Sequence, residues 1–287
     1  MSQAELLSAV GLIRTSRRRG FCPACRLFQT GEGPQEISAP ALIALAFLVL
    51  AAIAWTVTVV RMSAMDDMAM GLGPLGPFVV AWTVMMAAMM LPAVAPVGGL
   101  YARTIRMQTA GPGARAARVA GLVAGYLGAW AAFGLAAFAI ADVAGRLAAR
   151  EPDAARWVGA AVLVAVGVYQ FTPAKNRCLA HCRSPLGVLL HVGGYRGPLR
   201  DVRAGLYHGA YCVGCCWGLM VALIALGVMD LRWMAAVAVV VVLERTWRYG
   251  WATAYAVGVG LIVLGLLAPW HPSLIPGLHG PAMPMGM

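Results

Sequence analysis

The stretch GLYHGAYCVGCCWGLMVALIALGV, residues 205–228, indicates the fold class of this 287-residue chain. It holds no Asp, Glu, Lys or Arg, and as a helix it would extend about 36 Å, enough to cross roughly 30 Å of bilayer hydrocarbon. Over the whole chain, 61% of residues are hydrophobic and 11% are charged, against about 45–50% and about 25% in globular domains. This composition excludes a soluble enzyme, a disordered chain and a coiled coil. It predicts an all-α, polytopic transmembrane helix bundle.

Further apolar runs predict about seven spans (six to seven), at residues 41–60, 75–97, 119–141, 157–171, 205–228, 231–243 and 251–267. We expect Pro92 and Pro96 to break the second span near its end. The fourth is short and would need helix tilt or bilayer thinning, and the sixth is short enough to be re-entrant.

The runs divide the chain into three parts. They are an N-terminal extension, residues 1–40; a transmembrane domain, 41–270; and a tail, 271–287, rich in Pro, Gly, Met and His. The extension lacks the apolar core of a cleavable signal peptide. The tail cannot bury enough apolar surface to fold alone, so we expect it to be flexible.

The positive charges predict an orientation. Seventeen of the 22 Lys and Arg residues lie before span one, between spans two and three, between four and five, or between six and seven. Basic residues in short loops stay cytoplasmic, so we expect the N-terminus inside and the C-terminus outside the cell membrane. The same rule explains the net charge of +11, and no nucleic-acid partner is expected.

The methionines gather in two places. Met62, Met65, Met68 and Met70 cluster beside Asp66 and Asp67, while Met85, Met86, Met89 and Met90 lie midway along the second span. Residues four apart share a helical face, and thioethers select soft ions such as Cu(I). Helix packing would explain the second group equally well. From the outer group, we regard Met65, Met68, Asp66 and Asp67 as secondary metal candidates.

The cysteines predict a metal site more directly. Span four is followed by CLAHC, with Cys178, His181 and Cys182, and span five opens with HGAYCVGCC, with His208, Cys212, Cys215 and Cys216. If both segments are helical, each group places thiols on one face, at the cytoplasmic ends of adjoining spans. Thiolates and imidazoles in fours suit Zn(II), and fewer thiolates suit Cu(I). Nearby Lys175, Arg177 and Arg183 would favour the deprotonation that metal binding needs.

Two further features are weaker. Cys22 and Cys25 form a lone CPAC, which is half of a zinc site or a redox motif and a secondary metal candidate. Glu244, at the end of the sixth run, either pairs with Arg245 or faces inward near the ligands.

The motifs MDDMAM, WTVMMAAMMLP, CLAHCRSPLG and GLYHGAYCVGCCWGLM, in this order, resemble the bacterial predicted metal-binding integral membrane proteins known as domain of unknown function 2182. The resemblance covers about residues 62–247. It implies metal binding and a place in the bacterial inner membrane, without an established reaction. The motif residues it carries are Met85, Met86, Met89, Met90, Pro92, Cys178, His181, Cys182, His208, Cys212, Cys215 and Cys216.

The leading hypothesis is metal handling, delivery or transport, with copper favoured over zinc because eight methionines add nothing to a zinc site. Its partners would be the lipid bilayer, the metal ion and an unidentified metallochaperone or metalloprotein. One alternative is a thiol–disulfide oxidoreductase coupled to a quinone, with Cys178/Cys182 and Cys212/Cys215 as exchanging pairs. Another is a non-catalytic assembly factor for a metalloprotein. A non-enzymatic role is favoured because hydrolase motifs are absent.

Overall fold

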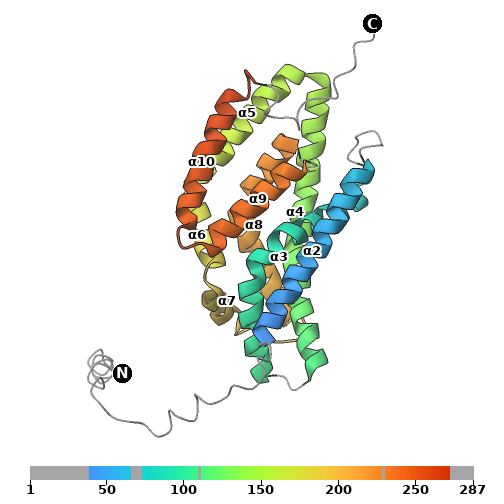
Figure 1. Cartoon of the computed structure of the whole chain (residues 1–287), viewed down its shortest axis with the longest axis vertical. Coiled ribbons are helices and arrows are strands. Elements are labelled where there is room, and N and C mark those ends of the chain that lie inside the picture. Colours follow the sequence, from blue (N-terminus) through green and yellow to red (C-terminus); the bar gives the residue numbers. More distant parts are fainter. Residues whose placement is uncertain (1–38, 66–72, 109–110, 228–229, 272–287) are drawn as a thin grey trace, which may run out of the picture. The chain divides into compact units, whose positions relative to one another are not determined.

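The computed structural model describes residues 39–65, 73–108, 111–227 and 230–271. Over these residues the chain is helical without strands, as predicted (Figure 1). The helices are α2 (Ala39–Met65), α3 (Leu75–Gln108), α4 (Pro112–Arg150), α5 (Pro152–Tyr169), α6 (Pro173–Cys182), α7 (Pro185–Val192), α8 (Arg200–Gly227), α9 (Leu231–Thr246) and α10 (Gly250–Leu267). Cys22, Cys25, Asp66, Asp67 and Met68 lie outside the described residues, as does the tail from residue 272.

Fewer helices than predicted are long enough to cross a membrane. Five meet the requirement of length and apolarity, namely α2, α3, α4, α8 and α10, and a sixth span results if α5 and α6, bent by 63°, are counted together. The 16-residue α9 is too short. The predicted break at Pro92 and Pro96 is wrong, because α3 continues through both prolines. Surrounding helices can compensate for the lost backbone hydrogen bonds.

Helices α3 and α8 form the centre of the bundle. In each of these two helices, 67% of an apolar 18-residue stretch is buried inside the protein, against 17% in α2 and 22% in α10. The peripheral helices instead expose large apolar side chains, such as Leu48 and Ile53 on α2 and Val259 and Leu266 on α10. Helices α5 and α10 pack side by side, and α2 packs along α3 (Figure 1).

Glycines bring α4 and α8 into backbone contact. A Cβ added at Gly205 would lie 2.0 Å from the carbonyl oxygen of Leu122. One added at Gly125 would lie 2.0 Å from the carbonyl oxygen of Val202. Only glycine permits this approach. It places the Cys/His face of α8 against the side chains of α4.

Polar contacts hold the same helices at one end. Asp201, in the first turn of α8, accepts hydrogen bonds from the hydroxyl of Tyr101 on α3 and, at 3.0 Å, from Nε of Arg118 on α4. A carboxylate in this position also complements the positive end of the helix dipole. The contacts join α3, α4 and α8 where α8 begins.

Both ends of α9 are fixed by polar contacts. At its start the Asp230 side chain accepts a hydrogen bond from the backbone N–H of Arg232, and the side-chain hydrogen bond from Arg232 lowers the pKa of this carboxyl, which keeps it ionised as a cap. Near its end, Nζ of Lys175 on α6 lies 2.8 Å from Oε1 of Glu244, and it also donates to Gln170. These contacts set the position of α9 on α6.

Removing the glycine contact should loosen α8. We expect Gly205→Ala to lower the stability of the folded protein by about 1–3 kcal/mol, because the methyl group would overlap the backbone of α4. Thermal unfolding in detergent measures this. Gly260→Ala on α10 is the matched control, because a Cβ there meets no atom within 4 Å. Equal unfolding temperatures for the two variants would refute the assigned contact.

The pair formed by Lys175 and Glu244 should be costly to break and cheap to replace. We expect Lys175→Met to destabilise the protein by about 3–5 kcal/mol, because it leaves a carboxylate buried without its counter-charge. Adding Glu244→Leu should restore most of the loss, since apolar pairs replace buried ion pairs well. Thermal unfolding of both variants tests this. A double variant as unstable as the single one would contradict it.

Candidate metal centre

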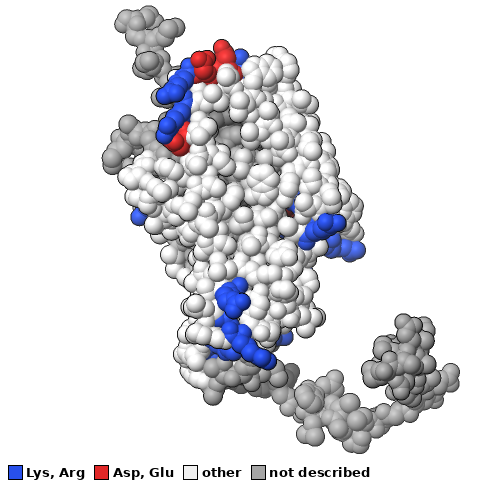
Figure 2. Space-filling view, turned by 180° about the vertical axis from the view of Figure 1, so that it is seen from behind, with Lys and Arg blue, Asp and Glu red and all other residues white. Residues whose placement is uncertain are grey.

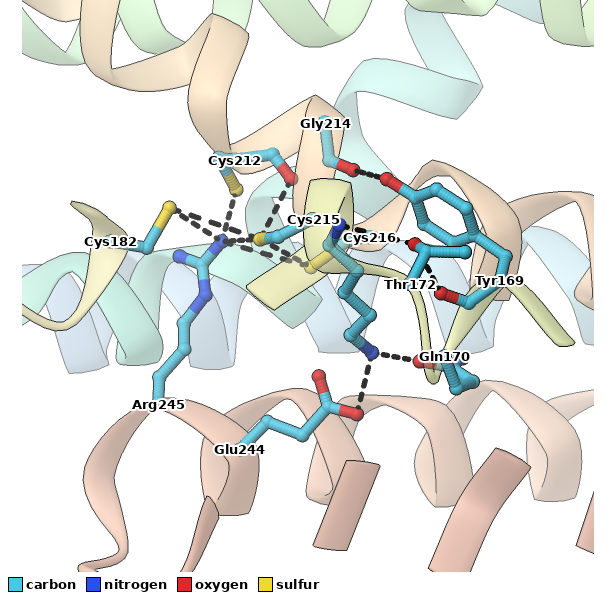
Figure 3. Close-up of polar contacts among 11 residues, drawn as sticks. Tyr169, Gln170, Thr172, Cys182, Cys212, Gly214, Cys215, Cys216, Glu244 and Arg245 are labelled. Carbon is cyan, nitrogen blue, oxygen red and sulfur yellow. Dashed lines mark hydrogen bonds and ion pairs between the residues drawn. The ribbon is translucent and has the colours of Figure 1, made fainter. Parts of the chain in front are cut away.

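Four cysteine sulfurs surround one arginine nitrogen. Nη2 of Arg245 lies 2.6 Å from Sγ of Cys212, 3.3 Å from Cys215, 3.7 Å from Cys216 and 3.8 Å from Cys182. Figure 3 shows the guanidinium pointing into this group from α9. We call the four cysteines the sulfur cluster. Its members come from α6, which follows the apolar run 157–171, and from α8, which covers the run 205–228 up to residue 227.

Local helix geometry explains how the cluster forms. Cys212, Cys215 and Cys216 occupy positions i, i+3 and i+4 of α8, which share one face. Cys182 is the last residue of α6. All four thiols are buried, with exposed fractions of 5% or less. They therefore form an enclosed set of donors rather than a surface patch.

The sulfurs are close enough to share an ion. Sγ of Cys182 lies 3.8 Å from Sγ of Cys215, which lies 3.3 Å from Sγ of Cys216. Two thiolates bound to one ion at about 2.3 Å would be about 3.8 Å apart in tetrahedral geometry. Within the described part of the chain, no group of three or more His, Cys, Asp or Glu side chains could hold a metal ion as arranged. Nη2 stands at the point common to the four sulfurs, so an ion could enter only if the guanidinium moved aside.

His208 lies one turn before Cys212 on α8. Its imidazole stacks on the ring of Tyr126, with centroids 5.9 Å apart, and the hydroxyl of Tyr126 lies 2.8 Å from Sγ of Cys212. His208 is 2% exposed, and neither ring nitrogen has a hydrogen-bond partner among the residues that the structure describes. A buried polar group without a partner is costly. The imidazole is thus a donor next to the cluster whose bonding capacity is unused.

Two predicted ligands lie apart from the cluster. The His181 ring stacks on Tyr211, with centroids 3.9 Å apart, and its edge contacts Tyr207. Cys178 is half-buried beside Gly214, where an added Cβ would meet its sulfur at 3.0 Å. Of the CLAHC motif, only Cys182 therefore contributes to the four sulfurs around Arg245.

The in-span methionines are core residues. Met86, Met89 and Met90 are completely buried on α3, and Met85 is 6% exposed. They belong to one continuous apolar core with Cys212, Cys215, Cys216, Met220 and Met234. The four side chains leave α3 on more than one face and are all buried, which agrees with a role in packing. Binding of metal by these thioethers stays a prediction. The side chain of Met65 lies outside the described residues.

The basic residues expected beside the thiols have other surroundings. Lys175 binds Glu244, Arg183 donates to the carbonyl oxygen of Trp247 at 2.6 Å, and Arg177 is exposed. The cation that contacts the sulfurs is Arg245 instead. Of the two alternatives for Glu244, pairing with Arg245 is wrong, because the two neighbouring side chains bind different partners (Figure 3). Glu244 instead faces inward, fully buried, and binds Lys175.

The site can bind a soft, thiophilic cation next to a fixed positive charge. Comparison with known proteins points to the same chemistry. Residues 79–268, more than half of the chain, match the PpoB2 family, described as a copper chaperone. This region contains the sulfur cluster, His208, the α3 methionines and Arg245, but not the CPAC motif. No curated protein and no solved structure is significantly similar. The chain belongs to the PpoB2 copper chaperone family.

Proposed function

We propose that this chain is a copper chaperone of the bacterial inner membrane that binds Cu(I) in the sulfur cluster and passes it to a partner metalloprotein or metallochaperone. The observation that carries the proposal is the convergence of four buried sulfurs, from Cys182, Cys212, Cys215 and Cys216, on one point. Soft ligands of this kind select Cu(I). Unlike zinc, Cu(I) is satisfied by fewer thiolates in a linear or trigonal set.

The outer surface supports a place in the membrane. Five or six helices are long and apolar enough to cross it, and many large side chains that face outward are apolar. On the face in Figure 2 the acidic side chains lie near the end formed by the turn between α4 and α5, together with basic side chains, and the surface beyond them is mostly uncharged, with a few basic side chains further along. Large exposed apolar surfaces are rare in soluble monomers, whereas lipid tails would cover them.

The charge distribution supports an orientation. The connection between α6 and α8 carries several basic residues and no acidic residue before Asp201, while the turn between α4 and α5 carries both signs. By the positive-inside rule the first would be cytoplasmic and the second exterior. The N-terminus would then be cytoplasmic. The C-terminus would lie outside if α9, although too short for a full span, leads the chain back toward the inner side before α10 crosses outward.

This orientation suggests a route for copper. Methionines and histidines would lie outside, methionines at mid-depth on α3, and thiols nearer the cytoplasm. From the outside inward, Cu(I) would thus meet thioethers first and the more strongly binding thiolates last. His208 and its two unpartnered nitrogens stand next to the strong end. The role could equally be assembly of a metalloprotein without net transport.

A thiol–disulfide oxidoreductase is the second candidate. One observation favours it, because the sulfurs of Cys182 and Cys215 are only 3.8 Å apart. The sequence predicts exchange between the pairs Cys178/Cys182 and Cys212/Cys215, each of which lies within one helix. The sulfur contact between α6 and α8 is instead the one between Cys182 and Cys215. Thiol exchange needs an accessible sulfur, and both members of this contact are buried. Copper binding explains the enclosure better.

Loss of three cluster thiols should remove most copper binding. We expect the purified Cys182→Ser, Cys212→Ser, Cys216→Ser triple variant to retain about one tenth or less of the copper of the wild type after anaerobic loading with Cu(I), because one remaining thiol cannot form a two-thiolate site and hydroxyls do not replace thiolates as soft ligands. Elemental analysis of detergent-purified protein measures the metal content.

The matched control is Cys178→Ser, whose sulfur does not contact Arg245 and which should keep its copper. Elution in size-exclusion chromatography confirms that each variant is folded. Wild-type copper content in the triple variant would show that the sulfur cluster is not the binding site.

The orientation can be tested with cysteines added on either side. We expect Glu151→Cys, in the exposed α4–α5 turn, to react with a membrane-impermeant maleimide on intact cells, and Arg196→Cys, in the exposed α7–α8 connection, to react only after permeabilisation. Wild-type cells give the background from native thiols. The reverse pattern would contradict the orientation, and rapid labelling of native Cys178 or Cys212 from outside would favour the oxidoreductase.

A further inference from the structure

Arg245 is a charged residue in a place where charge is expensive. It is 7% exposed, and its only hydrogen-bond partners are sulfurs, while Nε and Nη1 have none among the described residues. An arginine side chain is always protonated. Moving a charge out of water costs far more than a neutral hydrogen bond returns. A positive charge held in this position therefore needs a negative partner in the sulfur cluster.

No carboxylate supplies this partner. Glu244, next in the chain, is bound to Lys175 on the other side. Asp201, the only other buried carboxylate in the part of the chain described, binds Tyr101 and Arg118. The remaining source of negative charge at Arg245 is deprotonated sulfur.

We propose that Arg245 is the specificity-determining residue of the sulfur cluster, because its single positive charge matches the single negative charge of Cu(I) bound by two thiolates. This inference rests on the proposed copper binding. Cu(I) would bind the thiolate that already balances Arg245 and displace one proton from a second thiol, two S–Cu bonds would form, and the proton would leave to water. Copper keeps its oxidation state. The complex carries a charge of −1, and the guanidinium beside it makes the enclosed site neutral.

Zn(II) fits this site less well. With four thiolates its complex carries a charge of −2, which a single guanidinium leaves uncompensated in an apolar core. With three thiolates and His208 as a fourth donor the charge is matched, but a tetrahedral ion must then lie at the point common to its ligands, where Nη2 of Arg245 stands. Two-coordinate Cu(I) needs only two of the four sulfurs, so the guanidinium, displaced from the point common to all four, can stay beside the remaining ones. Because Nε and Nη1 have no hydrogen-bond partner among the described residues, the guanidinium can move without breaking any polar contact except those to the sulfurs.

The test is competition between the two metals. Detergent-purified wild type, Arg245→Gln, Arg245→Lys and Arg248→Gln are equilibrated with fixed free concentrations of Cu(I) and Zn(II), and both bound metals are measured. We expect Arg245→Gln to lower the ratio of bound copper to bound zinc by about tenfold or more, because a charge-assisted contact is lost. Arg245→Lys should retain most of the preference.

Arg248→Gln is the matched control, since it removes the same charge from an exposed residue three positions away. It should leave the ratio unchanged. A wild-type ratio in Arg245→Gln, or an equal loss in Arg245→Lys, would overturn the role of Arg245. Absence of copper from the wild type itself would instead overturn the proposed function.

A second measurement needs no variant. X-ray absorption at the copper edge of the Cu(I)-loaded wild type should show two sulfur neighbours per copper. Three or four sulfur neighbours would overturn the charge match even if Arg245→Gln does not fold.

Discussion

The arrangement at the centre of this protein depends on a positive charge buried among sulfurs. A guanidinium in an apolar environment must find negative partners, because water is not available to solvate it. Arg245 finds them in four thiols whose protons can be lost, and those thiols are held at one point by the same interaction. In this way α9, which is too short to cross a membrane on its own, is joined to α6 and α8 at the cluster.

The surrounding helices give this interaction its geometry. The close backbone contact of α4 and α8 through Gly125 and Gly205 fixes where the cysteine face of α8 points. The buried ion pair between Lys175 and Glu244 fixes the end of α9 on α6. Arg183 adds a second connection by donating to the carbonyl oxygen of Trp247. Three separate contacts therefore converge on the position of Arg245 relative to the thiols.

Membership of a copper chaperone family gives the sulfur cluster a chemical context. A chaperone must bind its ion tightly enough to protect it and loosely enough to release it. An enclosed set of more thiols than Cu(I) needs would allow the ion to move from one pair of sulfurs to the next by ligand exchange. The positive charge nearby would limit how many thiolates hold the ion at once.

The sequence alone determined the helical class, most of the apolar segments and the residue types of the site, because hydrophobic runs and the i, i+3, i+4 spacing of Cys212, Cys215 and Cys216 are local properties of a chain. It overestimated the spans, since a run such as 231–243 has the composition of a span without its length. Only the tertiary structure decided that Cys182 joins the α8 thiols while Cys178 and His181 do not. It also decided that Arg245, rather than Lys175 or Arg183, faces the sulfurs. Adjacent residues on a helix point in different directions, and which partner each one meets depends on how helices distant in sequence pack.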